Sequence, residues 1–162
     1  MEKNYKQQGF TLLEMLVTIV IAAIIAAIAI PALQTTIINN RVEATANDLR
    51  NMFISKRNQA ISNGQQQIIS HASITNIAND YDDVLIKRND GLTTSIIIAA
   101  DGTLSSTALI HIGYSVCYTG DNGKINNKAV VVFPSGLASV KGAKQLLAND
   151  NDDSVQYQSI DC

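Results

Sequence analysis

The sequence predicts an α+β fold in which one long N-terminal helix packs against a β-rich antiparallel domain. Residues 10–30 form an apolar run, a helical pattern continues from there to Asn63, and the remaining chain alternates short apolar segments with turn dipeptides. Only 16% of the residues are charged, against about 25% in soluble domains, and much of the difference comes from the N-terminal run. Together these features predict one membrane-tethered domain.

The apolar run is long enough to cross a membrane. As a helix, the 21 residues from Phe10 to Ile30 extend roughly 31 Å, about the thickness of the hydrocarbon core. The short segment before them carries two lysines and one glutamate, and this net positive charge favours the cytoplasmic side. We therefore expect a single-pass chain whose residues after Pro31 lie on the opposite side of the membrane.

Glu14 is the most informative residue of this run, because a carboxylate at the centre of a membrane helix costs about 2.5–3.5 kcal/mol, and less near an interface. Such a group usually has a partner and a purpose. Two interpretations of the N-terminus are open. Ala27-Ile28-Ala29 fits the small-x-small cleavage site of a secretory signal, whereas Gly9 places a small residue before the apolar run.

The segment Gly9-Phe10-Thr11-Leu12-Leu13-Glu14, together with Pro31, resembles the N-terminus of type IV pilins and of the pseudopilins of type II secretion. The resemblance implies that a prepilin peptidase cleaves between Gly9 and Phe10 and that the new amino group of Phe10 is methylated. It also implies that Glu14 pairs with the N-terminal amine of a neighbouring subunit, and that Pro31 kinks or locally loosens the helix. A generic membrane anchor with one isolated acid is the less favoured alternative.

Beyond Pro31 the pattern predicts an amphipathic continuation of the helix. Apolar residues recur at three- and four-residue steps from Ile38 to Ala60, and Asn63-Gly64 supplies a C-terminal stop. With the resemblance, this predicts a pilin-like fold with four segments. They are a prepilin leader (1–9), a transmembrane and assembly helix (10–30), the amphipathic continuation (31–64) and a β-rich periplasmic domain (65–162).

The β-rich part predicts one or two antiparallel sheets, with turns at pairs such as Asp90-Gly91 and Asp101-Gly102. Val130 to Phe133 has apolar residues on both faces, which predicts a central strand that ends at the turn Pro134-Ser135-Gly136. The expected strands are Gln67–Ser70, Val84–Arg88, Ser95–Ala100, Ala108–Ile112, Tyr114–Tyr118, Ala129–Phe133 and Val155–Ser159.

Two segments resemble more closely the GspH/FimT family of minor pseudopilins and minor pilins. They are the helical stretch from Asn40 to Gln65 and the strand and turn from Val131 to Gly136, whose Phe-x-Pro-x-Gly turn is one residue shorter here. The resemblance implies a structural subunit, without enzyme activity or cofactor, that primes or caps a type IV pilus or a type II secretion pseudopilus. Its implied partners are other major and minor pilins or pseudopilins, the prepilin peptidase and the inner membrane.

Cys117 and Cys162 both lie in the part expected to be exported. An even pair in an oxidising compartment is most simply a disulfide. It would tie the C-terminus to the middle of the domain and contribute up to about 4–5 kcal/mol by the loop-entropy estimate. The wide spacing and the flanking residues do not favour a metal pair or a redox motif.

DNA uptake is the alternative function, because some FimT-type minor pilins resemble DNA receptors whose C-terminal arginines contact the phosphate backbone. Here the last basic residues are Lys141 and Lys144, and four aspartates follow them. That charge would repel phosphate. A basic patch remains open if the fold gathers Lys124, Lys128, Lys141 and Lys144, so DNA binding is an alternative that we do not favour.

Metal binding and catalysis find little support. Asp80–Asp83 and Asn149–Asp153 supply oxygen ligands, but neither segment has the glycine and distal glutamate of an EF-hand, so we expect solvated acidic loops and no metal site. His71 and His111 are isolated in the sequence, and no serine lies in a nucleophile-elbow motif. The sequence therefore predicts no enzyme.

Overall fold

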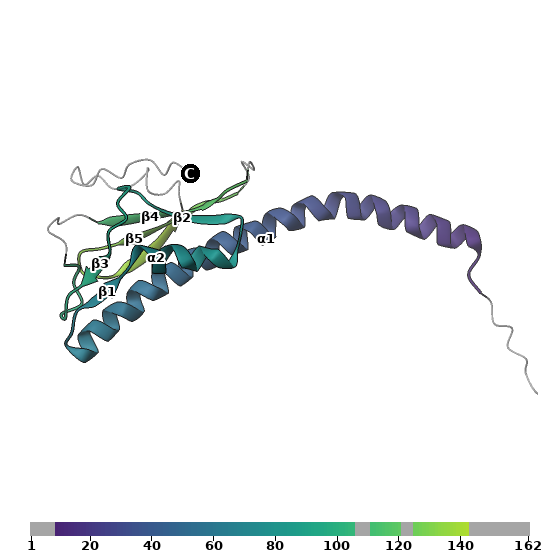
Figure 1. Ribbon diagram of the computed structural model, residues 1–162. Helices are drawn as coiled ribbons and strands as arrows, with labels where there is room; N and C mark the ends of the chain where they lie inside the picture. The colour runs from purple at the N-terminus through teal and green to yellow at the C-terminus, as the bar shows by residue number, and fades with distance from the viewer. Residues whose placement is uncertain (1–8, 106–110, 121–124, 143–162) are drawn as a thin grey trace, which may run out of the picture. The chain divides into compact units, whose positions relative to one another are not determined.

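The structure of the chain is a computed structural model that describes residues 9–105, 111–120 and 125–142. Its elements (Figure 1) are α1 (Leu12–Asn63), β1 (Gln67–Ile69), α2 (His71–Thr75), the 3-10 helix η1 (Asn76–Asp80), β2 (Val84–Arg88), β3 (Ile96–Ile98), β4 (Ile112–Tyr118), β5 (Lys128–Val132) and β6 (Ala138–Gly142). Residue contacts divide the chain into two units, 1–36 and 37–162. The predicted α+β fold class, a long N-terminal helix with antiparallel sheets, is confirmed.

Helix α1 ends where the sequence predicts. Gly64 follows its last residue with φ 63°, a left-handed conformation that stops a helix at little cost for glycine. The N–H of Gln65 then donates to the carbonyl of Ala60 at 3.3 Å, which satisfies one of the free carbonyls of the last turn. In the first unit, every described side chain from Phe10 to Gln34 is exposed.

The second unit contains two antiparallel sheets, a four-stranded one in the order β2-β4-β5-β6 and a two-stranded one formed by β1 and β3. Strand β5 lies between β4 and β6, so the predicted central strand is confirmed. Its Val130 and Val132 belong to the main core, whereas Ala129 and Val131 are buried in a second cluster with Phe133. Side chains alternate along a strand, so β5 is buried on both faces.

The main core forms where the second half of α1 packs on the sheets (Figure 1). The side chains of Val42, Ala46, Leu49 and Phe53 are fully buried at steps of three and four residues, as the amphipathic pattern predicts. The ring of Phe53 lies 5.7 Å from that of Tyr114 in β4, measured between centroids. Burying each large apolar side chain contributes about 1.5–3 kcal/mol, so this face of the helix supplies much of the stability of the unit.

Three arginines of α1 add polar contacts around this core. Arg41 forms an ion pair of 2.8 Å with Asp83, and its guanidinium carbon lies 5.6 Å from the centre of the Tyr81 ring. The Nε of Arg50 donates to the carbonyl of Ala138 at 3.2 Å, and the Nε of Arg57 donates to that of Ser135 at 3.0 Å. Both carbonyls belong to the chain that leaves β5 and enters β6, so the helix supports that turn directly.

Strand β4 differs from the expectation. The sequence analysis placed separate strands before and after Gly113, but residues 112–118 form one strand. Asn89 explains the continuity, because its side chain occupies the space where a Cβ of residue 113 would lie. The backbone N–H of Asn89 donates to the Gly113 carbonyl at 2.9 Å, and the side-chain Oδ1 of Asn89 accepts from the Ser115 hydroxyl at 2.7 Å. The glycine marks a close approach inside a strand. Residues 108–110 and the expected strand Val155–Ser159 lie outside the described residues.

Helix α2 and strand β6 were not predicted. The hydroxyl of Ser70 caps α2 by accepting from the N–H of Ser73 at 3.1 Å. Strand β6 has little apolar alternation and forms because a tight turn returns the chain to β5. Gly136 in that turn has φ 74°, and a Cβ there would overlap the carbonyl oxygen of Gly102, so only glycine fits without strain.

Tyr114 has a buried hydroxyl that makes no hydrogen bond within the described part of the chain. Its side chain is 1% exposed, and this burial raises the pKa of the phenol. A raised pKa in the folded state means that folding favours the neutral phenol. The contribution of this group to stability is therefore complete below the ordinary tyrosine pKa of about 10 and decreases as the pH rises above it.

We predict that Tyr114→Phe leaves the free energy of unfolding at neutral pH unchanged or raises it by about 1 kcal/mol, because it removes an unsatisfied hydroxyl and keeps the ring. Denaturant unfolding of the full chain in detergent measures this. The variant should also lose less stability than the wild type when the pH rises above about 10. A destabilisation of about 2 kcal/mol or more at neutral pH would show instead that the hydroxyl makes a stabilising bond.

Candidate functional site

The predicted cleavage site lies in an accessible segment that precedes the helix. Gly9, Phe10 and Thr11 are exposed and come before the first residue of α1, and the side chain of Phe10 is 86% exposed. A Cβ added at Gly9 would meet no atom within 4 Å, and Gly9 is not in a left-handed conformation. The chain itself therefore does not require glycine here, and a protease could reach the bond between Gly9 and Phe10.

Thr11 and Glu14 form a capping box at the start of α1. The carboxylate oxygen Oε2 of Glu14 accepts from the backbone N–H of Thr11 at 2.9 Å and from its hydroxyl at 2.8 Å, and the N–H of Glu14 donates to the Thr11 hydroxyl at 3.2 Å. This reciprocal arrangement satisfies backbone donors that the first turn leaves free. The sequence analysis missed it, although the Thr-x-x-Glu spacing is its usual signal.

Three further threonines of the apolar half are bonded to their own helix. The hydroxyl of Thr18 donates to the carbonyl of Met15 at 2.8 Å, that of Thr35 to Pro31 at 3.2 Å, and that of Thr36 to Ala32 at 3.1 Å. Hydroxyls bonded in this way can enter an apolar environment without losing all hydrogen bonds.

Helix α1 contains a stretch that is long and apolar enough to cross a membrane, and none of this stretch is buried in the structure. A core helix of a soluble protein also passes a test of length and composition, but its apolar residues would be covered. Pro31 lies inside α1, and because it has no N–H, the carbonyl of Ala27 receives no helical bond from it.

The two described lysines of the set proposed for DNA binding, Lys128 and Lys141, do not share a face. In the register of β5 and β6, Lys128 lies opposite Gly142, and Ala129 lies opposite Lys141. Because successive side chains alternate, Lys128 and Lys141 project from opposite faces of the sheet. The Nζ of Lys128 is 3.8 Å from a carboxylate oxygen of Glu43. Lys124 and Lys144 lie outside the described residues.

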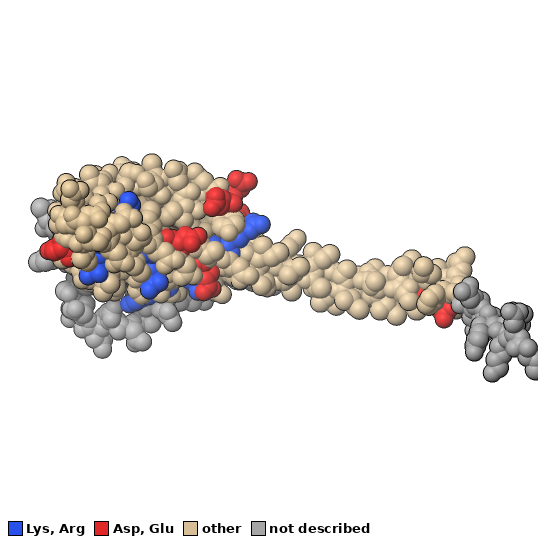
Figure 2. All heavy atoms as spheres, turned by 90° about the horizontal axis from the view of Figure 1, so that it is seen from below, with Lys and Arg blue, Asp and Glu red and all other residues tan. Residues whose placement is uncertain are grey.

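The surface charge has the same mixed character. On the face shown in Figure 2, acidic and basic side chains of the second unit are interspersed rather than separated by sign. Phosphate binding usually depends on a continuous basic surface. This view shows none over the described residues.

The cysteine pair and the acidic loops are only partly described. Cys117 lies in β4 and is 1% exposed, whereas Cys162 lies outside the described residues, so the disulfide stays a prediction. Asp83 of the first acidic loop is paired with Arg41, and Asn149–Asp153 also lies outside the described residues. Over residues 9–105, 111–120 and 125–142, no group of three or more His, Cys, Asp or Glu residues could hold a metal ion.

Residues 4–30 match the prokaryotic N-terminal methylation motif. This segment includes Gly9, Phe10, Thr11 and Glu14, and the match confirms that the N-terminus resembles that of the type IV pilin superfamily. No curated protein matches the chain. The narrower resemblance to the GspH/FimT family stays a prediction.

Two solved structures are similar to the chain, both crystal structures of the type IV minor pilin FimU of Pseudomonas aeruginosa strain PAO1, in space groups P21 and P65. Both are 14% identical to the chain, with TM-scores of 0.47 and 0.45. The alignments cover 63% and 61% of this chain and 89% and 91% of the FimU chains. Similarity at this level carries no argument about function.

Proposed function

We propose that the chain is a minor pilin or pseudopilin, a structural subunit of a type IV pilus or of a type II secretion pseudopilus. The observation that carries the proposal is the N-terminal methylation motif over residues 4–30. Its support from the structure is local: the bond between Gly9 and Phe10 is exposed, α1 begins at Leu12, and Glu14 lies in the first turn.

Hydrolysis between Gly9 and Phe10 would leave a carboxylate on the leader and a free amino group on Phe10. An α-amino group has a pKa of about 7.7–8.0 and is largely protonated at neutral pH. Thr11, the next residue, donates to Glu14 at 2.9 Å, so cleavage creates a cation one residue from the group that holds the carboxylate. Processing therefore changes the charge at the start of the helix where Glu14 already lies.

In the separate subunit, the capping box stabilises the Glu14 carboxylate through its own chain. During assembly the carboxylate would exchange this cap, or share it, with the amino group of a neighbouring subunit. Removing water strengthens the attraction between the two charges. Such a buried pair offsets the cost of a carboxylate in an apolar helix and selects one register between subunits, which is a contribution to specificity more than to stability.

Within this proposal the GspH/FimT family is the candidate subfamily, and the two segments that carry that resemblance are in contact. Arg57 of the helical segment donates to the carbonyl of Ser135 in the turn segment. The proposed partners are other pilins or pseudopilins and the prepilin peptidase. The proposed location is the inner membrane, with residues after Pro31 in the periplasm, because the positive leader favours the cytoplasm.

We predict that Gly9→Leu leaves the chain unprocessed in cells that contain the prepilin peptidase. The structure has room for a side chain at this position, so the loss would reflect recognition by the peptidase and not misfolding of the substrate. Mass spectrometry of the purified protein measures the retained leader. Gln8→Leu is the matched control and should be cleaved; a normally shortened Gly9→Leu product would refute the cleavage site.

We predict that Glu14→Ala inserts into the membrane but enters filaments about tenfold less efficiently or worse, because a buried amine of the neighbour then lacks its partner. The ratio of this subunit to the major subunit in sheared filaments measures incorporation. Thr11→Val is the matched control, since it removes the capping hydroxyl and keeps the carboxylate. Wild-type incorporation of Glu14→Ala would contradict the pairing, and an equal defect in Thr11→Val would assign the effect to helix capping.

A further inference from the structure

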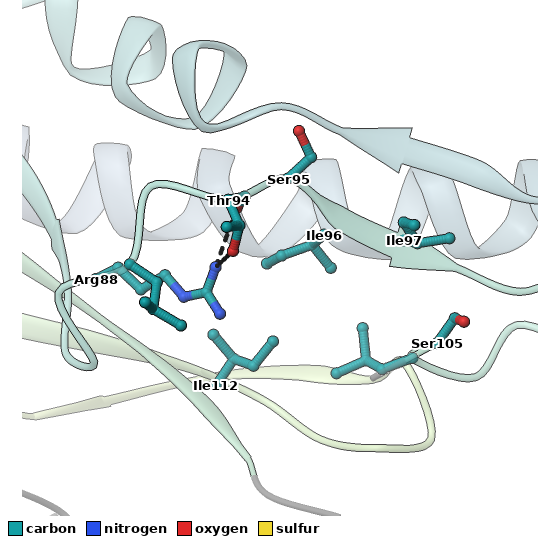
Figure 3. Close-up of a pocket in the computed structure, with 9 residues that line it drawn as sticks. Arg88, Thr94, Ser95, Ile96, Ile97, Ser105 and Ile112 are labelled. Carbon is teal, nitrogen blue, oxygen red and sulfur yellow. Dashed lines mark hydrogen bonds between the residues drawn. The ribbon is translucent and has the colours of Figure 1, made fainter. Parts of the chain in front are cut away.

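A cavity of about 260 Å³ lies beside the end of β2, between β3 and β4. Its lining combines apolar side chains, among them Ile96, Leu104 and Ile112, with the polar residues Thr94, Ser95 and Ser105. The charged group among its lining residues is the guanidinium of Arg88, which Figure 3 shows between Thr94 and Ile112. All of these residues belong to the second unit. We call this cavity the Arg88 pocket.

The side chain of Arg88 is 8% exposed, so its charge is largely removed from water. Its Nε lies 2.8 Å from an oxygen of Asp90, and its Nη1 donates to the backbone carbonyl of Thr94 at 3.1 Å and to the Thr94 hydroxyl at 3.4 Å. The buried Nε nevertheless makes no hydrogen bond of good geometry within the described residues. A guanidinium has five N–H donors, and buried donors without acceptors cost free energy.

A second unsatisfied group lies next to Arg88. Tyr114 is the residue opposite Arg88 in the register of β2 and β4, and its buried hydroxyl also lacks a partner among the described residues. Tyr114 projects from the same face of β4 as Ile112, which lines the cavity, because the two are separated by two positions. Tyr114 itself is not a lining residue, so Arg88 is the buried polar group that an oxygen-bearing ligand in the cavity would meet.

We propose that the Arg88 pocket binds a carboxylate presented by the polypeptide of a neighbouring subunit; the identity of this partner rests on the proposed function. A planar guanidinium matches the two oxygens of a carboxylate, and apolar lining residues such as Ile96 and Ile112 suit the methylene groups that carry it. The volume is below the 300–1,000 Å³ that is usual for small-molecule sites, which favours a single amino-acid side chain or chain end.

The existing ion pair does not prevent this binding. The side chain of Asp90 is 41% exposed, so Asp90 can turn to water when the carboxylate of a ligand takes its place beside Arg88. Leu92, another lining residue, is 51% exposed and offers an apolar contact to a partner. A side-chain carboxylate and a C-terminal carboxylate share the required chemistry, and the experiment distinguishes them.

The test titrates the full chain in detergent micelles with three short peptides and follows the Nε–H signal of Arg88 by NMR. The peptides are acetyl-Ala-Glu-Ala-amide, acetyl-Ala-Gln-Ala-amide and acetyl-Ala-Ala-Ala with a free C-terminus. We expect a saturable shift with one or both carboxylate peptides and none with the glutamine peptide. A response to the first peptide alone identifies a side-chain carboxylate, and a response to the third alone identifies a chain end.

Two variants and a matched control assign the binding to the pocket. Arg88→Lys keeps the charge but not the planar geometry and should weaken binding about tenfold. Leu104→Trp keeps Arg88, fills the cavity and should abolish binding, which keeps the test decisive if Arg88→Lys alters the fold. Lys87→Gln removes a charge from the adjacent, exposed position on the other face of β2 and should change nothing.

The proposal is overturned if neither carboxylate peptide binds, if the glutamine peptide binds equally well, or if Leu104→Trp binds like the wild type. A shift that acetate reproduces at the same concentration, and that Arg88→Lys leaves unchanged, would show an adventitious ion only. The assay contains no other subunit, so its failure would leave the pilin proposal intact. Normal cleavage of Gly9→Leu would instead remove that proposal without affecting the binding result.

Discussion

The free-energy cost of the Glu14 carboxylate governs the N-terminal part of this protein. The charge lies in the first turn of an otherwise apolar stretch, and in the separate chain Thr11 compensates for it through two hydrogen bonds to the same oxygen. A capping box stabilises the start of a helix through bonds within one chain, so it needs no neighbouring subunit. In the assembled filament that we propose, an amino group created at Phe10 would be a stronger partner, because the attraction between opposite charges increases as water is removed. Processing would thus turn a local cap into a contact between subunits.

The second half of α1 has a different task, which is to form the core of the second unit. Leu49 and Phe53 are fully buried against the sheets, Arg57 bonds to a backbone carbonyl of the turn between β5 and β6, and Arg50 bonds to the carbonyl of the first residue of β6. The same helix is thus apolar and exposed before Pro31 but amphipathic and packed after residue 37. Its sequence changes character where its surroundings change.

Local patterns made the helix, its stop at Gly64, strands β1, β2 and β3 and the central position of β5 predictable. Three other features depend on contacts between distant residues and could not be predicted. Strand β6 depends on the turn at Gly136, the continuity of β4 depends on Asn89 filling the space over Gly113, and the opposite orientations of Lys128 and Lys141 depend on strand register. The capping box was readable from its spacing and was missed. The Arg88 pocket combines residues of β2, β3 and β4, so no single segment indicates it.

The most direct test of the account is the N-terminus of the wild-type protein isolated from its own cells, determined by mass spectrometry. The account predicts a chain that begins at Phe10 and carries a methylated amino group. A chain that begins at Met1, or one that begins after Ala29 at the alternative small-x-small site, would contradict it. The second result would identify the apolar segment as a removed signal sequence, and Glu14 would then have no role in the mature protein.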